Sequence, residues 1–415
     1  MIDATHQNAG SEVHGAVLAA HKQVRPLRIL HLLGGLSRGG IETWLMHVLR
    51  RTDRRLFEMD FIVRGVHKGD YEDEVEKLGS KIGRTLNHRH PLKYASELRR
   101  FVEEHGPYDI VHSHLSEYDG LMLRAAYNLG ARVRISHSHN DLRSMDGSAP
   151  PYQRAYLGLA RRLIKSYATH CLAASDLAAI SQFGPSWRSD PRVQILHYGI
   201  DLNHFASQRS TNREELRRAL GVPDRAFVIG HVGRLAAQKN HEFLIEVFAL
   251  LAKKDPTVHL LMVGAGPRLE DINALVARTG LSSRVTLLGS RPDIPQLMLD
   301  AMDVFLFPSI YEGLGIVLIE AQAAGLPCVV SDVIPEEACI DPSAFEILSL
   351  SRPAAEWANR IRRYQESPRP EPRALQMSGS SFDIAVSAKR LFELYARSAA
   401  RPARYFPNDS LSTIS

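Results

Sequence analysis

Short apolar runs alternate with amphipathic segments along most of the chain. The first run, at 28–33, is followed by the glycine-rich sequence GGLSRGG and then by apolar residues at helical spacing, among them Ile41, Leu45 and Val48. A similar order recurs at 59–79, at 96–129 and, after a polar stretch, from 226 onward. Strands that alternate with helices in this way predict an α/β fold with parallel sheets covered by helices on both faces.

The length of the chain and one polar stretch predict two domains. A chain of 415 residues exceeds what one hydrophobic core usually serves. Residues 202–224 are rich in Ser, Asn and Arg and interrupt the alternation, so we place the linker near 202–210. The predicted units are a tail at 1–25, a Rossmann-like domain at 26–205, a second Rossmann-like domain at 206–381, a helix at 382–397 that packs back on the first domain, and a tail at 398–415.

The segment 303–327 combines an apolar run, a glycine-containing turn and a second apolar run with helical spacing. This pattern predicts strand, loop and helix, with Glu312, Gly313 and Gly315 at the helix N-terminus, where backbone N–H groups and the helix dipole attract an anion. Glu320 lies inside the otherwise apolar helix, and burying an unpaired acid there is costly. Taken alone, the two glutamates also fit a capping residue and a solvent-facing one.

A basic loop follows the predicted strand at 226–232. Arg234 and Lys239 lie in this loop, and a planar guanidinium together with a point charge suits a diphosphate. Two ordinary surface cations are the alternative. Further glycine turns or basic loops follow other predicted strands, and we include their residues in the candidate binding site: Gly39, Gly40, Gly264, Gly266 and Arg291. The glycines match neither a P-loop nor GxGxxG.

Histidines end two neighbouring predicted strands: His112 and His114 on one, His137 and His139 on the next. Ligands of parallel sheets bind beyond the carboxyl ends of the strands, so all four are expected on the ligand side. No matching Cys, Asp or Glu cluster accompanies them, and we predict no metal and no cofactor. A hydrogen bond from His137 to a sugar or phosphate is the favoured role, and a structural role is the alternative.

Charge and composition limit the partners. The net charge of +5 and pI near 9.1 favour anionic partners, such as nucleic acid, nucleotide phosphates or anionic lipid. The basic amphipathic helix predicted at 150–168 packs against the sheet or, alternatively, lies on an anionic membrane. Three cysteines without CxxC spacing indicate reduced thiols in a cytoplasmic protein. No run approaches the roughly 20 apolar residues of a membrane span, and the first residues do not resemble a secretory signal.

Taken together, four motifs resemble the family-4 retaining glycosyltransferases of the GT-B fold, in particular enzymes of bacterial exopolysaccharide and capsule biosynthesis. They are VGR-x4-K, VGxGP, DVFLFPS-x2-EG and EGLGIVLIEAQAAGLP. The likeness runs from about residue 26 to 395 and includes GGLSRGGIETW, DIVHSH, RISHSHN and QKNHEFLI. It implies two Rossmann-like, doubly wound domains that face each other across a cleft.

The resemblance also implies roles for individual residues. Arg234 and Lys239 would hold the pyrophosphate of a nucleotide-sugar donor, Glu312 would hydrogen-bond the donor sugar, and Glu320 would bind the ribose hydroxyls. His137 would approach the sugar. The implied catalytic residues are therefore His137, Glu312, Arg234 and Lys239, and further donor contacts come from Gly39, Gly40 and the backbone of Gly313, Leu314 and Gly315.

By this resemblance the chain is expected to transfer a sugar from a UDP-sugar to a glycan or lipid-linked oligosaccharide with retention, without a metal and without a nucleic-acid partner. It would work in the cytoplasm, with peripheral contact to the anionic inner face of the plasma membrane. Alternatives are a non-catalytic nucleotide-sugar-binding protein, or an epimerase or phosphorylase on the same fold. One departure is visible: Tyr198 stands where the family usually has Asn.

Overall fold

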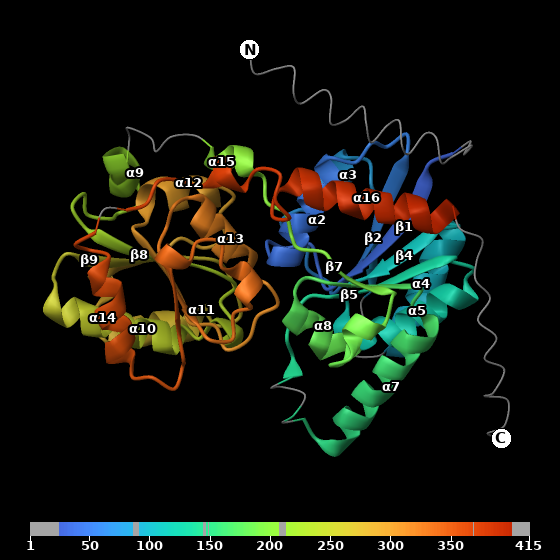
Figure 1. Cartoon of the computed structure of the whole chain (residues 1–415), viewed down its shortest axis with the longest axis horizontal. Coiled ribbons are helices and arrows are strands. Elements are labelled where there is room, and N and C mark those ends of the chain that lie inside the picture. The colour runs from blue at the N-terminus through green and yellow to red at the C-terminus, as the bar shows by residue number, and fades with distance from the viewer. Residues whose placement is uncertain are drawn as a thin grey trace, which may run out of the picture.

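The computed structural model describes residues 25–85, 91–143, 147, 149–206, 213–367 and 369–400. Figure 1 shows two α/β units side by side, the N-terminal one in blue to green and the C-terminal one in yellow to orange. The N-terminal unit comprises β1 (Leu27–Leu33), α2 (Gly40–Arg50), β2 (Phe57–Arg64), α3 (Glu72–Lys77), β3 (Ile82–Thr85), α4 (Pro91–His105), β4 (Ile110–Ser113), α5 (Asp119–Asn128), β5 (Val133–Ser138), α7 (Pro151–Tyr167), β6 (His170–Ala173), α8 (Asp176–Phe183) and β7 (Val193–Ile195).

The C-terminal unit repeats the alternation with shorter helices near its end. Its elements are α9 (Arg213–Ala219), β8 (Phe227–Val232), α10 (His241–Lys254), β9 (Val258–Val263), α11 (Leu269–Arg278), β10 (Val285–Leu287), α12 (Ile294–Gln296), β11 (Val304–Phe307), α13 (Ile316–Ala323), β12 (Cys328–Ser331), β13 (Phe345–Leu348), α14 (Ala354–Arg363) and α15 (Ala374–Met377), and the long helix α16 (Ile384–Ala400) follows.

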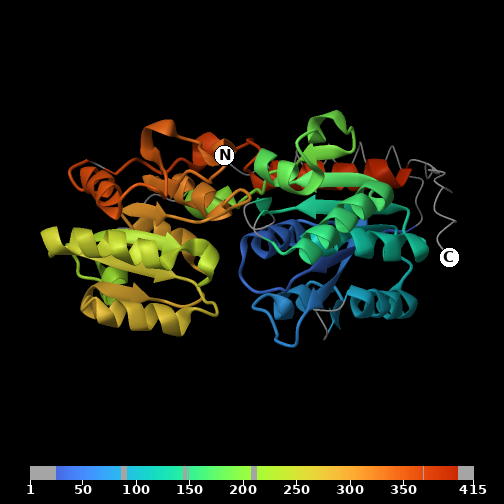
Figure 2. The ribbon, with the colours of Figure 1, turned by 90° about the horizontal axis from the view of Figure 1, so that it is seen from below.

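Each unit is built on one parallel sheet. The strand order is β3-β2-β1-β4-β5-β6-β7 in the first unit and β10-β9-β8-β11-β12-β13 in the second, with all registered pairs parallel. The central strands are nearly continuous apolar runs because helices cover both faces, as Figure 2 shows. The prediction of two doubly wound, Rossmann-like units is therefore confirmed.

In both sheets the strand order reverses beside the first strand of the unit, between β1 and β4 and between β8 and β11. At such a switch point the loops leave in opposite directions, and a crevice forms beyond the carboxyl ends of the strands. The loops that follow β8 and β11 include the basic loop and the glutamate-containing turn predicted from the sequence.

Helix α16 returns the chain to the N-terminal unit, along which it lies in Figure 1. The Trp44 indole N–H donates to Ser387 Oγ at 3.0 Å, and the rings of Phe57 and Phe392 stack with 5.0 Å between their centroids. Deeper in the core, the Tyr395 hydroxyl lies 2.7 Å from Nδ1 of His112. The last helix thus forms part of the first unit's hydrophobic core.

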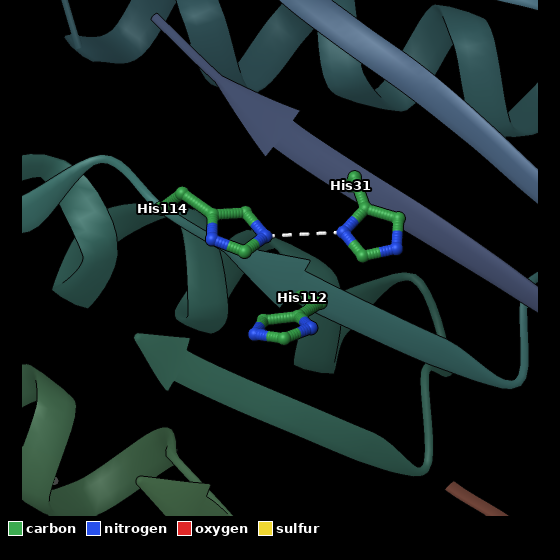
Figure 3. Close-up of side chains that lie close together, drawn as sticks. All are labelled: His31, His112 and His114. Carbon is green, nitrogen blue, oxygen red and sulfur yellow. Dashed lines mark hydrogen bonds between the residues drawn. The ribbon is translucent and has the colours of Figure 1, made fainter. Parts of the chain in front are cut away.

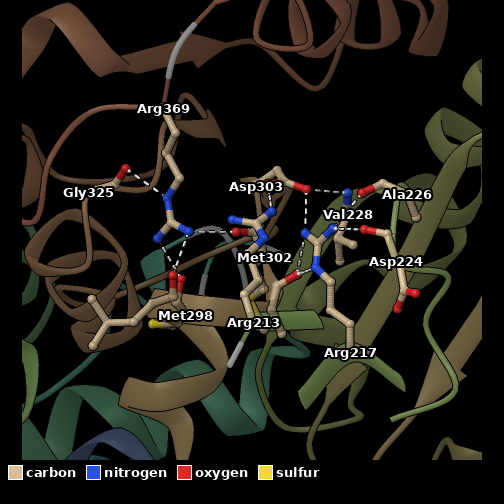
Figure 4. A network of polar contacts seen from close by, with 12 residues as sticks. Arg213, Arg217, Asp224, Ala226, Val228, Met298, Met302, Asp303, Gly325 and Arg369 are labelled. Atoms are coloured by element: carbon tan, nitrogen blue, oxygen red, sulfur yellow. Dashed lines mark hydrogen bonds and ion pairs between the residues drawn. The ribbon is translucent and has the colours of Figure 1, made fainter. Parts of the chain in front are cut away.

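Arginine side chains tie together the segments around the start of β11, as Figure 4 shows. Arg217, whose side chain is 2% exposed, donates to the carbonyl oxygens of Ala226 and Ala301 and to the Asp303 carboxylate at 2.7 Å. Asp303 also accepts from the Val228 N–H at 2.8 Å. These bonds link α9, β8 and β11, and so position the strands whose ends carry the candidate site.

Candidate active site

The loop after β8 carries the two cations expected to bind phosphate. Lys239 ends a short 3-10 helix (Ala237–Lys239); its ammonium group donates to the Glu312 carboxylate and lies 4.5 Å from the Phe307 ring centroid. The Lys239 and Glu312 side chains are only 12% and 6% exposed. The Arg234 guanidinium is exposed, and no hydrogen bond or ion pair joins it to any residue that the structure describes. An incoming anion therefore meets one unpaired and one paired cation.

Gly264 and Gly266 let the turn after β9 pack directly against this basic loop. A Cβ on Gly264 would lie 1.9 Å from the Gly233 carbonyl oxygen, and one on Gly266 would lie 2.3 Å from the Leu235 carbonyl oxygen. Both distances are far below van der Waals contact, so only glycine fits at either position. The two predicted binding glycines thus have a packing reason in this structure: they position the loop of Arg234 and Lys239.

The turn after β11 packs directly against the N-terminal unit. A Cβ on Gly313 would lie 1.7 Å from the carbonyl oxygen of His139. The Ser175 hydroxyl donates to the Gly313 carbonyl oxygen at 2.6 Å, and the Asp141 N–H donates to the Glu312 carbonyl oxygen at 3.1 Å. The Glu312–Gly313 backbone is therefore held against the N-terminal unit, and glycine is required at the point of closest approach.

Two helix N-termini face each other beside this turn. Gly315 precedes α13 in the left-handed conformation, with φ of 75°, after the buried Leu314. Gly39 precedes α2, and a Cβ on Gly40 would lie 3.2 Å from Cγ2 of Ile316, the first residue of α13. Because helix N-termini carry unpaired N–H groups and partial positive charge, this arrangement suits an anion.

Two carboxyl groups near these helix starts hold their protons more tightly than usual. Burial raises the pKa of Glu320 to about 8, and no described residue donates a hydrogen bond or ion pair to it. Burial likewise raises the pKa of Glu42, in the first turn of α2, to about 7, although the nearby Arg234 guanidinium opposes the shift. Perturbed acids beside unpaired cations are typical of functional sites. Sequence reasoning missed Glu42, which follows the glycine pair by only two residues.

His137 and His139 occupy different depths of the N-terminal unit. His137 is fully buried: its Nδ1 lies 3.2 Å from Nε2 of His112, and its Nε2 has no partner among the described residues. His139 follows β5, and its carbonyl oxygen contacts Gly313. Of these two histidines, His139 therefore lies nearer the C-terminal unit, and the H-x-H spacing alone could have suggested it. The Nδ1 atom of His139 is hydrogen-bonded to the Tyr198 hydroxyl.

The strand histidines pack under α2 and α16 instead of facing an open cleft. They form two groups of three whose nitrogen atoms lie within 4.8 Å of one another, and a histidine on β1 joins them. The reason is geometric: side chains two apart on a strand share a face, and neighbouring parallel strands bring those faces together. Most of their ring nitrogens bond to each other, and neither group contains a carboxylate or thiolate. The groups are His31, His112, His114 and His114, His137, His139.

Arg291 is engaged elsewhere. Its guanidinium makes two hydrogen bonds to the Asp293 carboxylate, at 2.8 and 2.6 Å. The structure thus joins Lys239, Glu312 and the α13 N-terminus directly, whereas no described contact links Arg291 to them. The arrangement as a whole offers cations, helix N-termini and buried carboxylates around one interdomain turn.

Models of two glycosyltransferase families match the two units. The Glycosyl transferase 4-like domain covers residues 39–199, and Glycosyl transferases group 1 covers residues 212–377. The protein EpsF of Bacillus subtilis (strain 168), whose glycosyltransferase assignment is itself provisional, is 36% identical over 372 residues, which are 89% of this chain and 96% of that protein. A UDP-Gal:alpha-D-GlcNAc-diphosphoundecaprenol alpha-1,3-galactosyltransferase of Escherichia coli is 30% identical over 54% of this chain and 58% of its own length.

Solved structures show the same fold. Anabaena Alr3699/HepE, in complex with UDP and glucose, superposes with a TM-score of 0.74 at 22% identity and covers 88% of this chain and 98% of its own. WaaG, a glycosyltransferase involved in lipopolysaccharide biosynthesis, superposes with a TM-score of 0.63 at 19% identity over 90% of this chain and 98% of its own. The chain belongs to the family-4 glycosyltransferases of the GT-B fold.

Proposed function

We propose that this chain transfers a sugar from a UDP-sugar to a glycan or lipid-linked oligosaccharide acceptor in exopolysaccharide biosynthesis. The observation that carries the proposal is the meeting of the Arg234–Lys239 loop with the α13 N-terminus at the Lys239–Glu312 ion pair. Fixed cations and helix N-termini are what a departing diphosphate requires. Buried carboxylates beside them suit sugar and ribose hydroxyls.

In this proposal the donor replaces the Lys239–Glu312 pair. The diphosphate accepts hydrogen bonds from Lys239 and Arg234, and this frees the Glu312 carboxylate to accept bonds from the sugar. The Glu320 carboxyl group, which has no hydrogen-bonding partner among the described residues, accepts bonds from the ribose hydroxyls. Gly39 and Gly40 cover the donor from the N-terminal unit, where their lack of side chains leaves room for it.

The reaction breaks the bond between the anomeric carbon and the diphosphate oxygen and forms a bond from that carbon to an acceptor hydroxyl oxygen. The acceptor proton leaves with the diphosphate. We propose from the family resemblance alone that the anomeric configuration is retained. We also propose that no metal is needed, because Arg234, Lys239 and the α13 N-terminus offset the charge that develops on the leaving group. Contact between the units at Gly313 supports a closed state that keeps water from the donor.

The names of relatives support the substrate classes. The Escherichia coli relative is named for UDP-Gal and for an acceptor on diphosphoundecaprenol. Anabaena Alr3699/HepE is described in complex with UDP-glucose. These support a UDP-sugar donor and a lipid-linked acceptor.

We further propose that α7 brings the enzyme to an anionic membrane surface. Tyr152 and Leu159 on this helix are 77% and 52% exposed, and Arg154, Arg162 and Lys165 are exposed as well. Apolar and basic side chains together favour the interface of an anionic bilayer. None of the described helices has the length and apolarity to cross a membrane.

Flotation with anionic liposomes tests this contact. Reversing the charges of Arg162 and Lys165 should abolish flotation, whereas the matched change at Arg362 and Arg363, exposed on α14, should not. Equal flotation of both variants would contradict membrane contact through α7.

Release of UDP tests the transferase activity. Purified protein is incubated with a panel of UDP-sugars and a membrane lipid extract as acceptor source, alongside Lys239→Met and the control Lys254→Met at the exposed end of α10. We expect release from one UDP-sugar by the wild type and the control, with a loss of about 10²–10³ in rate for Lys239→Met. The anomeric proton of the product, observed by NMR, reports retention or inversion.

Other outcomes separate the alternatives. Calorimetric binding of a UDP-sugar without turnover would indicate a non-catalytic binding protein. Interconversion of UDP-sugars without UDP release would indicate an epimerase. Formation of a sugar phosphate from glycan and inorganic phosphate would indicate a phosphorylase.

A further inference from the structure

A line of buried imidazoles leads through the N-terminal unit to the interdomain turn. Nδ1 of His31 lies 3.0 Å from Nε2 of His114, and Nδ1 of His114 lies 2.7 Å from Nε2 of His139. Nδ1 of His139 is in turn bonded to the hydroxyl of Tyr198. Figure 3 shows the inner end, where a dashed line joins His31 to His114. We call His31, His114 and His139 the histidine line.

The hydrogen bonds between the three rings must all run in the same direction along the histidine line. The pKa values of His31 and His139 are lowered by burial to about 3, and that of His114 is lowered well below its usual range, so each ring is neutral and carries one N–H. Each bond between two rings uses one N–H and one lone pair. If His31 donates through Nδ1, then His114 and His139 also donate through Nδ1. If it accepts there, all three rings carry the proton on Nε2, and only His114 and His139 donate through it.

The inner end of the line is closed. Nε2 of His31 is buried and has no hydrogen-bond partner among the described residues. A reversal of the line would require a proton to enter or leave at that atom, so the direction is locked. If His31 donates through Nδ1, its buried Nε2 carries only a lone pair. If His31 accepts through Nδ1, its buried Nε2 carries an unpaired N–H, which folded proteins tolerate less.

The outer end of the line favours the same direction. Burial raises the pKa of the Tyr198 hydroxyl well above its usual value, and the electrostatic effects of Glu42 and Glu312 add to this shift. Carboxylates attract an O–H and repel an oxygen lone pair. If His139 donates to the Tyr198 oxygen, the O–H of Tyr198 is free to point toward these acids. The Tyr198 ring is held in place by Trp44, with 5.3 Å between ring centroids.

We propose that Tyr198 contacts the transferred sugar as a hydrogen-bond donor, and that the histidine line is the positioning device that fixes its hydroxyl in the donor state. This proposal rests on the proposed function. A sugar hydroxyl between the two units would then accept from Tyr198 on one side and donate to Glu312 on the other. Both ring nitrogens of His139 are occupied by this network, so its side chain acts through Tyr198.

Matched tyrosine variants test the contact. Tyr198→Phe removes the proposed donor, and Tyr395→Phe removes an equally buried hydroxyl that bonds to His112 away from the interdomain turn. We expect Tyr198→Phe to lower kcat/KM for the nucleotide sugar about tenfold or more, the loss of one hydrogen bond to the reacting sugar, with the Kd for UDP unchanged. Tyr395→Phe should keep both constants within about twofold of the wild type. An unchanged UDP affinity shows that the variant is folded. Equal kcat/KM values for Tyr198→Phe and the wild type would overturn the contact.

Ring-nitrogen NMR tests the positioning device. In protein labelled with ¹⁵N-histidine and assigned with single-histidine variants, His31, His114 and His139 should each carry the proton on Nδ1 at pH 7. A proton on Nε2 of His139 would overturn the proposal, because Tyr198 would then be donating to His139. A metal retained stoichiometrically through His31 and His114 would also overturn it, since metal-bound nitrogens carry no proton. If the proposed function is wrong, the wild type will release UDP from no nucleotide sugar. That outcome would refute the sugar contact, but the position of each histidine proton could still be measured by NMR.

Discussion

Removing the Lys239 ammonium group tests whether Lys239 and Glu312 are a mutually dependent buried pair. In Lys239→Met the Glu312 carboxylate, 6% exposed, loses its ion-pair partner while remaining shielded from water. Breaking a buried pair on one side costs about 3–5 kcal/mol, whereas neutralising both partners is often close to neutral. Because Lys239 keeps some exposure, we expect the lower end, a loss of about 3 kcal/mol in the free energy of unfolding. The double variant Lys239→Met/Glu312→Gln should lose only about 1 kcal/mol.

Urea denaturation followed by tryptophan fluorescence measures these differences at a single pH. The coupling energy is the cost of the double variant minus the costs of both single variants. Additive costs would refute the reasoning, because they would show that neither charge depends on the other. The Lys254→Met control, at an exposed position, should change stability by less than about 0.5 kcal/mol.

Three further predictions concern other parts of the structure. Gly313→Ala should reduce turnover at least about 100-fold without unfolding the chain, because its Cβ would collide with the His139 carbonyl oxygen and force the units apart; small-angle scattering should show a larger radius of gyration. Burial raises the pKa of Glu320 to about 8, so the folded chain keeps a proton that the unfolded chain loses above about pH 4.5. Stability should therefore fall as pH rises through this window, by at most about 4–5 kcal/mol, and Glu320→Gln should flatten the fall seen in urea titrations between pH 5 and pH 9. Arg217→Met should destabilise the C-terminal unit by about 2–3 kcal/mol, since two buried carbonyl groups lose the Arg217 guanidinium, whereas Asp303 keeps Arg213 and the Val228 N–H as donors; a thermal midpoint within 1 °C of the wild type would contradict this.

Local sequence patterns predicted the fold because each βα unit carries its own signals. In the segment 303–327, the apolar run became β11, the glycine turn became the loop, and the predicted helix became α13, Ile316–Ala323. Gly325 has a φ of 68°, as expected for a glycine that follows a helix. These features depend on residues a few positions apart, so the sequence alone defines them.

The candidate site was only partly predictable because its contacts join distant segments. The resemblance singled out Lys239 and Glu312, but their pairing across 73 residues depends on how the loops after β8 and β11 pack. The H-x-H spacing indicates that the two histidines of each pair lie on the same face of a strand. The contact of His31 with them depends on the register of β1 against β4, which no local pattern specifies. Tyr198 stands where the family usually has Asn. The sequence does not show that its hydroxyl is bonded to His139.

The contact between His112 and Tyr395 has a consequence for synthesis of the chain. The two residues are 283 positions apart in the sequence, and Trp44 is 343 positions from its hydrogen-bond partner, Ser387. Domains generally fold as units, the N-terminal one first, while the ribosome is still working. Here the first domain emerges with its sheet complete but without the helix that closes its core. It can reach its final packing only after α16 has left the ribosome, so the second domain is synthesised before the first one is complete.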